Sequence, residues 1–143
     1  LAAVPLAAIL SGPVPATPLE ATVLSWQNGD TLRVVVADRK ETVRLIGIDA
    51  PEVSQNAEPG TKPTGWESPL RELLDQVLLE LDVQTRDRYG RLLAYLWLPD
   101  GAMLNERILE AGWALLLTVP PNVRHVDRPR EAQRRARERG AGL

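Results

Sequence analysis

Missing residue types limit the chemistry open to this 143-residue chain. It has no cysteine and a single histidine, His125. This excludes disulfides, thiolate zinc sites, a cysteine nucleophile and a histidine-rich metal centre. A metal bound by this chain would therefore be a hard cation held by oxygen ligands. Phenylalanine is absent too, and four tryptophans and two tyrosines leave most of the core to leucine, valine and isoleucine.

The rest of the composition fits one globular domain. A chain of this size buries roughly two-thirds of its unfolded surface around a single core. Its net charge of −2 is unevenly distributed, because residues 124–143 carry +4 and the residues before them −6. A basic end on an acidic body indicates contact with a polyanion. A solvated arginine-rich helix is the alternative.

The first 17 residues are expected to form an extension, with the domain spanning 18–143. LAAVPLAAIL (1–10) is apolar but, with ten residues and a proline, too short to cross a membrane. SGPVPATP (11–18) is typical of a linker. We expect a secretory signal or anchor remnant followed by a linker, which favours a secreted or extracytoplasmic protein. An anchor remnant is also compatible with a membrane tether through this extension. The alternative is an N-terminal arm that packs on the domain.

Strand and helix signals alternate along the domain. Three strands are predicted first, at 19–26, 32–37 and 41–48, with hairpin turns at NGDT (28–31) and 38–40. After a polar loop at 53–67, apolar residues at i, i+3, i+4 and i+7 predict a helix over residues 69–81. The remaining predicted elements are strands at 82–86 and 91–98, a helix at 103–111, an extended segment at 113–119, and a last helix capped by Asp127 and ending near Gly140. This order predicts an α+β, mainly β, fold: a five-stranded OB-type barrel with three helices.

The stretch VRLIGIDAPE (43–52) places charged residues where a buried strand would have none. Arg44 interrupts the apolar run, and Asp49 and Glu52 follow at its exit. Arg44 and Asp49 are an odd number of residues apart, so a regular strand would point them to opposite faces. Their convergence requires a bend, and Gly47 is where a bend costs least.

These groups match the needs of phosphodiester cleavage: neutralised phosphoryl oxygens, an aligned water and a stabilised leaving oxygen. A hard cation held by carboxylates, with guanidinium forks beside it, supplies the neutralisation. Asp30, Asp49 and Glu52 are candidates for the cation and its water. Arg44 and Arg91 are candidates for the phosphate.

Four fragments together carry a family resemblance: NGDT (28–31), RLIGIDAPE (44–52), DRYGR (87–91) and NERILEAGWA (105–114). In this order they resemble the staphylococcal nuclease (thermonuclease-like) family, from residue 18 to the C-terminus. The resemblance implies an OB barrel with three helices. It also implies calcium-dependent cleavage of DNA and RNA to 3′-phosphate products.

The resemblance also implies a role for each matching residue. Asp30 and Asp49 correspond to the calcium-binding carboxylates, with the Ala50 carbonyl as a further ligand. Glu52 corresponds to the residue that holds or deprotonates the attacking water. Arg44 and Arg91 correspond to the phosphate-binding arginines. Arg88 and Tyr89 match the residues that contact the terminal phosphate of a nucleotide, although a tyrosine in a turn is more often a packing residue.

The chain departs from the staphylococcal pattern at several positions. Ala50 stands in place of a threonine and Asn28 in place of the commoner aspartate. Leu117 and Val119 stand where two tyrosines line the nucleotide pocket, so base stacking is expected to be weak. A non-catalytic OB-fold nucleic-acid-binding or interaction module is the alternative function. The expected partners are DNA, RNA or both, and no obligate protein partner is implied.

Overall fold

The computed structural model of the chain describes residues 17–50 and 76–141. Within these ranges the elements are, in order, β1 (Leu19–Asn28), β2 (Thr31–Val36), β3 (Arg39–Leu45), β4 (Ile48–Asp49), β5 (Val77–Arg86), β6 (Leu92–Trp97), α3 (Leu104–Glu110), β7 (Leu115–Leu116) and α4 (Asp127–Glu138). None of the described helices is long and apolar enough to span a bilayer.

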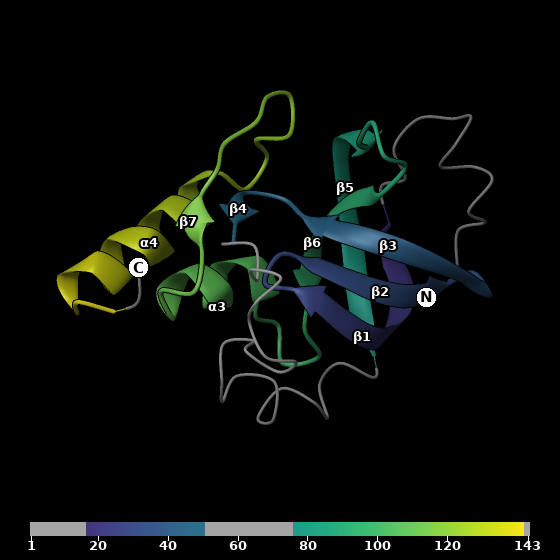
Figure 1. The fold of residues 1–143 in the computed structure, drawn as a ribbon, viewed down its shortest axis with the longest axis horizontal. Helices are drawn as coiled ribbons and strands as arrows, with labels where there is room; N and C mark the ends of the chain where they lie inside the picture. Colours follow the sequence, from purple (N-terminus) through teal and green to yellow (C-terminus); the bar gives the residue numbers. More distant parts are fainter. Residues whose placement is uncertain (1–16, 51–75, 142–143) are drawn as a thin grey trace, which may run out of the picture.

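Five strands close into a barrel in the order β1-β2-β3-β6-β5, and β1 pairs with β5 to complete it. All neighbours are antiparallel except β3 and β6, which run parallel. The short strands β4 and β7 form a separate two-stranded sheet. Figure 1 shows this small sheet at one end of the barrel, beside α3 and α4. The mainly β, OB-type barrel predicted from the sequence is confirmed.

Alternation of buried and exposed side chains builds the barrel core. In β2, Leu32, Val34 and Val36 point inward and are at most 2% exposed, while Arg33 and Val35 between them are partly exposed. This alternation, with a period of two residues, is typical of a strand that has one face in the core. The β2–β3 hairpin turns at Ala37 and Asp38, whose φ angles of +51° and +61° are those of a tight two-residue hairpin turn.

The predicted helix at 69–81 is wrong over its last five residues. Val77, Leu79 and Leu81 belong to β5, where they alternate with the partly exposed Leu78 and Glu80. Apolar residues at 77, 78 and 81 also fit the spacing of a helix. The end of the leucine run is therefore compatible with the helical period of about 3.6 residues and with the strand period of two. Three predicted parts lie outside the described residues: residues 69–75 of this helix, the loop at 53–67, and positions 1–16 of the N-terminal extension.

The two later helices confirm the predictions at 103–111 and 127–140, but Asp127 forms no side-chain capping bond at the start of α4. The predicted extended segment at 113–119 forms a strand only at Leu115–Leu116. On α4, Pro129, Ala132 and Ala136 are buried. Its contact with α3 also includes ion pairs, because Arg128 and Arg135 pair with Glu106.

Candidate active site

Arg44 projects from the middle of the barrel sheet, and backbone carbonyl oxygens hold its guanidinium group. It lies in β3 opposite Thr31 of β2 and beside Leu93 of β6. Its Nη1 donates to the carbonyl oxygens of Leu45 and Ile48, both at 2.8 Å. Its side chain is only 16% exposed, so the strand-embedded charge noted in the sequence is a positioned group.

The carboxylates of Asp30 and Asp49 both approach Arg44. Nη2 of Arg44 lies 3.5 Å from Oδ2 of Asp30 and 3.8 Å from Oδ1 of Asp49. The chain reaches this arrangement by turning at Gly47, where φ is +88°, a conformation that glycine adopts at little cost. The predicted convergence of Arg44 and Asp49 through a bend at Gly47 is confirmed.

Two hydrogen bonds fix this bend from outside the strand. The buried side chain of Asn105, on α3, donates from Nδ2 to the carbonyl oxygen of Ile46 at 2.7 Å. The backbone N–H of Leu117 donates to the carbonyl oxygen of Gly47 at 2.9 Å. Sequence reasoning missed Asn105 as a positioning residue, because its partner lies 59 positions away along the chain.

Asp30 is tied to residue 50 as well as to Arg44. Its Oδ2 accepts the Ala50 N–H at 2.9 Å and its Oδ1 accepts the Thr31 hydroxyl at 2.8 Å. Gly29 beside it has no room for a side chain, since a Cβ there would stand 2.6 Å from the Cβ of Ala50. The β1–β2 turn is therefore packed directly on the residue after β4.

The two carboxylates near Arg44 are oxygen donors of the kind that a hard cation takes. Asp30 and Asp49 offer carboxylate oxygens and the chain at Ala50 offers a carbonyl, the donor types that calcium takes. The Asp49 side chain is 61% exposed, so it remains open to solvent. Within residues 17–50 and 76–141, no group of three or more His, Cys, Asp or Glu side chains could hold a metal ion. Glu52, the third predicted carboxylate, lies outside the described residues.

Arg91 is positioned by Asp87 within the β5–β6 turn. The Asp87 carboxylate accepts Nε of Arg91 at 2.6 Å and the backbone N–H groups of Tyr89 and Arg91, each at 2.9 Å. Burial would raise the pKa of Asp87, but these three hydrogen bonds and the charge of Arg91 outweigh it and lower that pKa. Sequence reasoning missed this role, although aspartate at the first position of a four-residue turn signals it.

Arg88 and Tyr89 lie on the same turn and face solvent. The Tyr89 side chain is among the most exposed apolar groups described, with the residue 67% exposed. Its hydroxyl accepts a hydrogen bond from Nη2 of Arg88, and the guanidinium groups of Arg88 and Arg91 lie 4.8 and 5.3 Å from its ring centre. The turn thus presents an aromatic ring between two cations.

A cleft of about 210 Å³ brings the two predicted phosphate-binding arginines together. Arg44 and Arg91 both line it, because the parallel pairing of Val43 with Leu92 puts the start of β6 beside Arg44. Leu117 and Val119 line it as well, at 41% and 55% exposure. The cleft is therefore cationic at one part of its wall and aliphatic at another.

His125 belongs to a different cluster. Its Nε2 lies 2.9 Å from Oε1 of Glu80, and its ring packs edge-on against Tyr95 and Trp97. The Tyr95 hydroxyl donates to the buried Asp82 at 2.8 Å. These contacts fasten residues 122–125 to β5 and β6, which makes His125 a structural residue.

Comparison with known proteins gives a consistent result. The family model described as "Staphylococcal nuclease homologue" matches residues 42–143. A thermonuclease of Staphylococcus hyicus is 37% identical over 115 residues, covering 78% of this chain and 67% of the relative. A thermonuclease of Staphylococcus intermedius is 35% identical over 78% of the chain and 68% of the relative. Endonuclease YncB of Bacillus subtilis (strain 168) is 34% identical, and here the chain spans 54% of the relative's length. The chain belongs to the staphylococcal nuclease family.

Proposed function

We propose that this chain is a calcium-dependent nuclease that hydrolyses phosphodiester bonds of DNA, RNA or both and leaves 3′-phosphate products. One observation carries the proposal: Arg44 is shared between the carboxylates of Asp30 and Asp49 and a cleft that also contains Arg91. Such a site combines places for a cation and for a phosphate. The relatives named thermonuclease and endonuclease support the reaction class.

The phosphate would lie between the two guanidinium groups. Nη1 of Arg44 is occupied by two carbonyl oxygens, and Nε of Arg91 by Asp87. No described residue hydrogen-bonds Nη1 or Nη2 of Arg91, so that edge of the fork is free to donate to two phosphoryl oxygens. Both arginines are held before substrate arrives, which makes them suited to stabilise charge that develops in the transition state.

Asp30, Asp49 and the Ala50 carbonyl would hold the cation. Calcium bound there supplies positive charge beside the phosphate and a polarised water. Glu52 would hold or deprotonate the attacking water. As the new phosphorus–oxygen bond forms, the bond to the 5′-oxygen of the following nucleotide breaks, and the phosphate stays on the 3′ side. Arg44 and Arg91 would neutralise the extra charge on the phosphoryl oxygens during this step.

Specificity would rest on phosphate contacts more than on the base. Leu117 and Val119 give the cleft an aliphatic wall, which cannot supply the stacking energy of roughly 1–3 kcal/mol per base that an aromatic ring provides. Arg88 and Tyr89 would contact a terminal phosphate from the β5–β6 turn. The proposal thus predicts little base preference and a strong dependence on salt.

Hydrolysis of plasmid DNA and of RNA, each with calcium and with a chelator, tests the proposal. Activity should be lost in chelator and return when calcium is added in excess. Full activity in chelator, or activity restored by zinc and never by calcium, would show that the assignment of the metal is wrong. Absence of hydrolysis under every condition would favour the non-catalytic binding module instead.

A further inference from the structure

Most arginines of the basic C-terminal segment are already paired within the protein. Arg128 and Arg135 bind Glu106 on α3, and Arg135 also binds Glu110. Arg139 donates to the Glu110 carbonyl oxygen. Arg134 bridges Glu131 and Glu138 on α4 itself. Contact with a polyanion, which the charge of this segment indicates, would therefore use the arginines that remain.

Two arginines of α4 remain available to a ligand. The Arg130 side chain is 63% exposed, and among the described residues its one ion pair is long, 3.7 Å from Oδ1 of Asp127, whose own side chain is 92% exposed. Arg137 is exposed, and within the described part of the chain no ion pair or hydrogen bond holds its guanidinium group. Both are thus charged groups that a phosphate could reach without breaking a buried interaction.

Arg130 and Arg137 lie on the same side of α4 as Gln133, which contacts β7. Positions 130, 133 and 137 follow the i, i+3, i+7 spacing of one helix face. Gln133, between the two arginines, accepts the Leu116 N–H of β7 at 2.6 Å. The neighbouring Leu115 pairs with Asp49 in β4.

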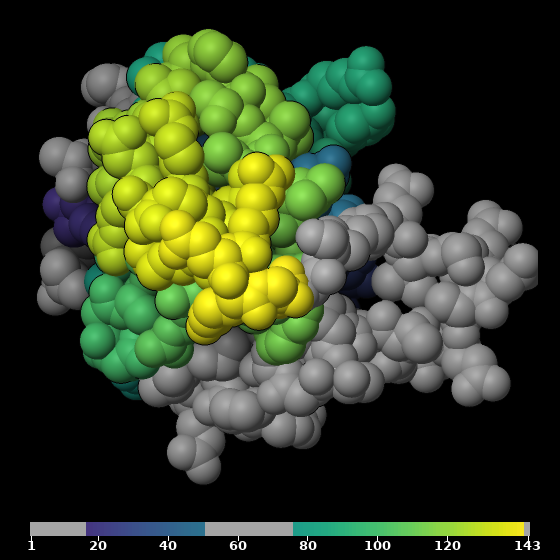
Figure 2. Space-filling view, turned by 90° about the vertical axis from the view of Figure 1, so that its left-hand side faces the viewer, coloured from purple at the N-terminus to yellow at the C-terminus, as the bar shows by residue number. Residues whose placement is uncertain are grey.

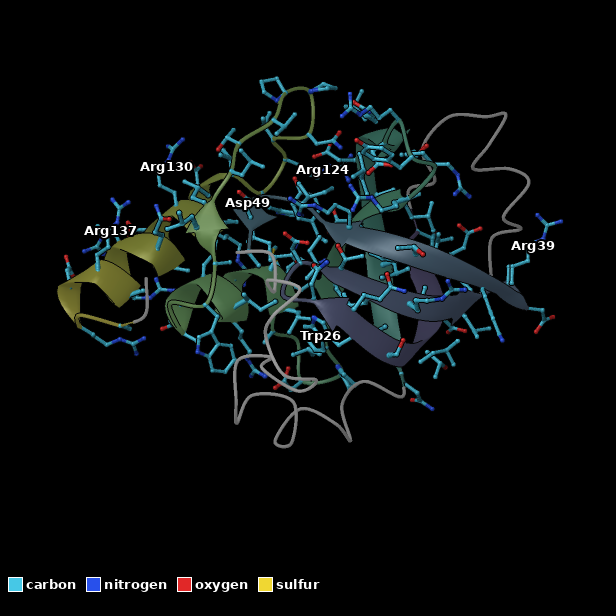
Figure 3. All side chains as sticks on the ribbon, viewed as in Figure 1. Trp26, Arg39, Asp49, Arg124, Arg130 and Arg137 are labelled. Carbon is cyan, nitrogen blue, oxygen red and sulfur yellow. The ribbon has the colours of Figure 1, made fainter. Side chains whose placement is uncertain are left out.

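The figures agree with this placement. In Figure 3 both arginine side chains leave the same, upper side of α4, and Asp49 is labelled to the right of α4 and β7. Figure 2 looks onto this end of the molecule and shows α4, in yellow tones, at the surface next to the lime-green residues that precede it.

We propose that Arg130 and Arg137 form an accessory phosphate-binding site for the part of a nucleic-acid strand that extends beyond the scissile bond. Seven helical residues separate their Cα atoms by about 10 Å along the axis, enough to contact two different phosphates. The site deepens the proposed function, on which it rests, because it makes a polynucleotide a better ligand than a dinucleotide. Phosphate contacts of this kind raise affinity and its salt dependence without reading sequence.

The test compares two double variants of equal charge. Arg130→Gln with Arg137→Gln removes the proposed site. Arg39→Gln with Lys40→Gln removes two exposed charges at the β2–β3 hairpin, and Figure 3 shows Arg39 at the opposite end of the molecule. Binding of a 20-nucleotide single strand and of a dinucleotide is measured by fluorescence anisotropy in chelator, across a salt series. Thermal unfolding of each variant confirms that it is folded.

Loss of the proposed site should weaken binding of the long strand on the order of 10-fold at low salt, while the control variant and all dinucleotide affinities stay near wild type. The slope of log affinity against log salt should become shallower by about 1.4, since each phosphate contact on a single strand contributes about 0.7. Equal losses in the two double variants, or unchanged binding in both, would overturn the proposed site. Because binding is measured without cleavage, such a result would leave the proposed hydrolysis standing. Failure of wild type both to bind and to hydrolyse would overturn both proposals.

Discussion

Arg44 and Asp49 meet across a bend that a regular strand would not make. Their side chains approach to 3.8 Å, although their spacing would place them on opposite faces of a sheet. The bend depends on Gly47 at φ +88° and on the hydrogen bond from Asn105 to the Ile46 carbonyl. The site geometry is therefore a property of the backbone between β3 and β4 as much as of the charged side chains.

Replacing Gly47 with alanine should reduce activity more than its effect on stability explains. A side chain at positive φ costs roughly 1 kcal/mol, and relief of that strain would move Asp49 away from Arg44. Gly101→Ala is the matched control, because Gly101 has φ +86° and open space around it, in a turn away from the site. Chemical unfolding should show similar losses for both variants, with reduced turnover for Gly47→Ala alone. Similar turnover in the two would contradict the role given to the bend.

Arg44→Lys keeps the positive charge but removes the planar fork. A lysine has a single nitrogen and cannot reproduce the separate Nη1 and Nη2 positions of the fork, from which Arg44 contacts the Leu45 and Ile48 carbonyls and the carboxylates. Turnover should fall on the order of 10²-fold, the usual loss when one preorganised charge-stabilising group is removed. Steady-state kinetics and unfolding measured on the same samples separate catalysis from stability. Near-native turnover would show that Arg44 is purely structural.

Leu117→Tyr should tighten nucleotide binding by adding a stacking surface to the cleft. A gain of about 1–3 kcal/mol corresponds to roughly 5- to 150-fold in affinity, with little change in the chemical step. Val123→Tyr is the control, since Val123 is similarly exposed, at 40%, but does not line the cleft. Titration calorimetry with a nucleoside bisphosphate measures both. Base-selective binding by the wild type that does not change with salt would mean that Tyr89 already supplies the stacking.

The cluster around Glu80 and Asp82 should make the fold sensitive to acid. Burial would raise both pKa values, but hydrogen bonds from Arg124, Trp97 and His125 lower the pKa of Glu80, and those from Arg124, Tyr95 and Val83 lower the pKa of Asp82. A lowered pKa stabilises the folded state above the ordinary values of 4.5 and 3.8, and that stabilisation is lost as pH falls through the folded pKa.

Denaturant unfolding between pH 7 and pH 3 measures this effect. The wild-type free energy of unfolding should fall below about pH 5. Asp82→Asn should be less stable at neutral pH, because a buried acceptor is lost, and should show a flatter decline in acid. If the free energy of unfolding falls identically in wild type and variant, Asp82 does not contribute to the loss of stability in acid.

The sequence predicted the structure correctly where the spacing of residues along the chain determines on which face a side chain lies. The odd interval between Arg44 and Asp49 required a bend, and strand alternation predicted the barrel. It failed at Val77–Leu81, because the leucine run fits a helix and a strand equally and the pairing of β5 with β1 and β6 decides between them. The roles of Asn105 and Asp87 depend on where distant backbone groups come to lie. The net charge of the C-terminal segment follows from the sequence. The ion pairs of its arginines with Glu106 and Glu110 depend on the packing of α4 against α3, which the sequence does not predict.

Asp49→Asn gives the most direct test of a calcium-dependent nuclease site. Among residues 17–50 and 76–141, the Asp49 carboxylate has one long ion pair, at 3.8 Å to Arg44, and its side chain is largely exposed, so the amide should leave stability near wild type. Cleavage of an end-labelled oligonucleotide is followed across a calcium titration for wild type and variant, and the product ends are analysed. We predict calcium-dependent cleavage to 3′-phosphate ends by the wild type, and a variant that needs far more calcium or stays inactive. Equal activity and equal calcium dependence of the two proteins would contradict the account.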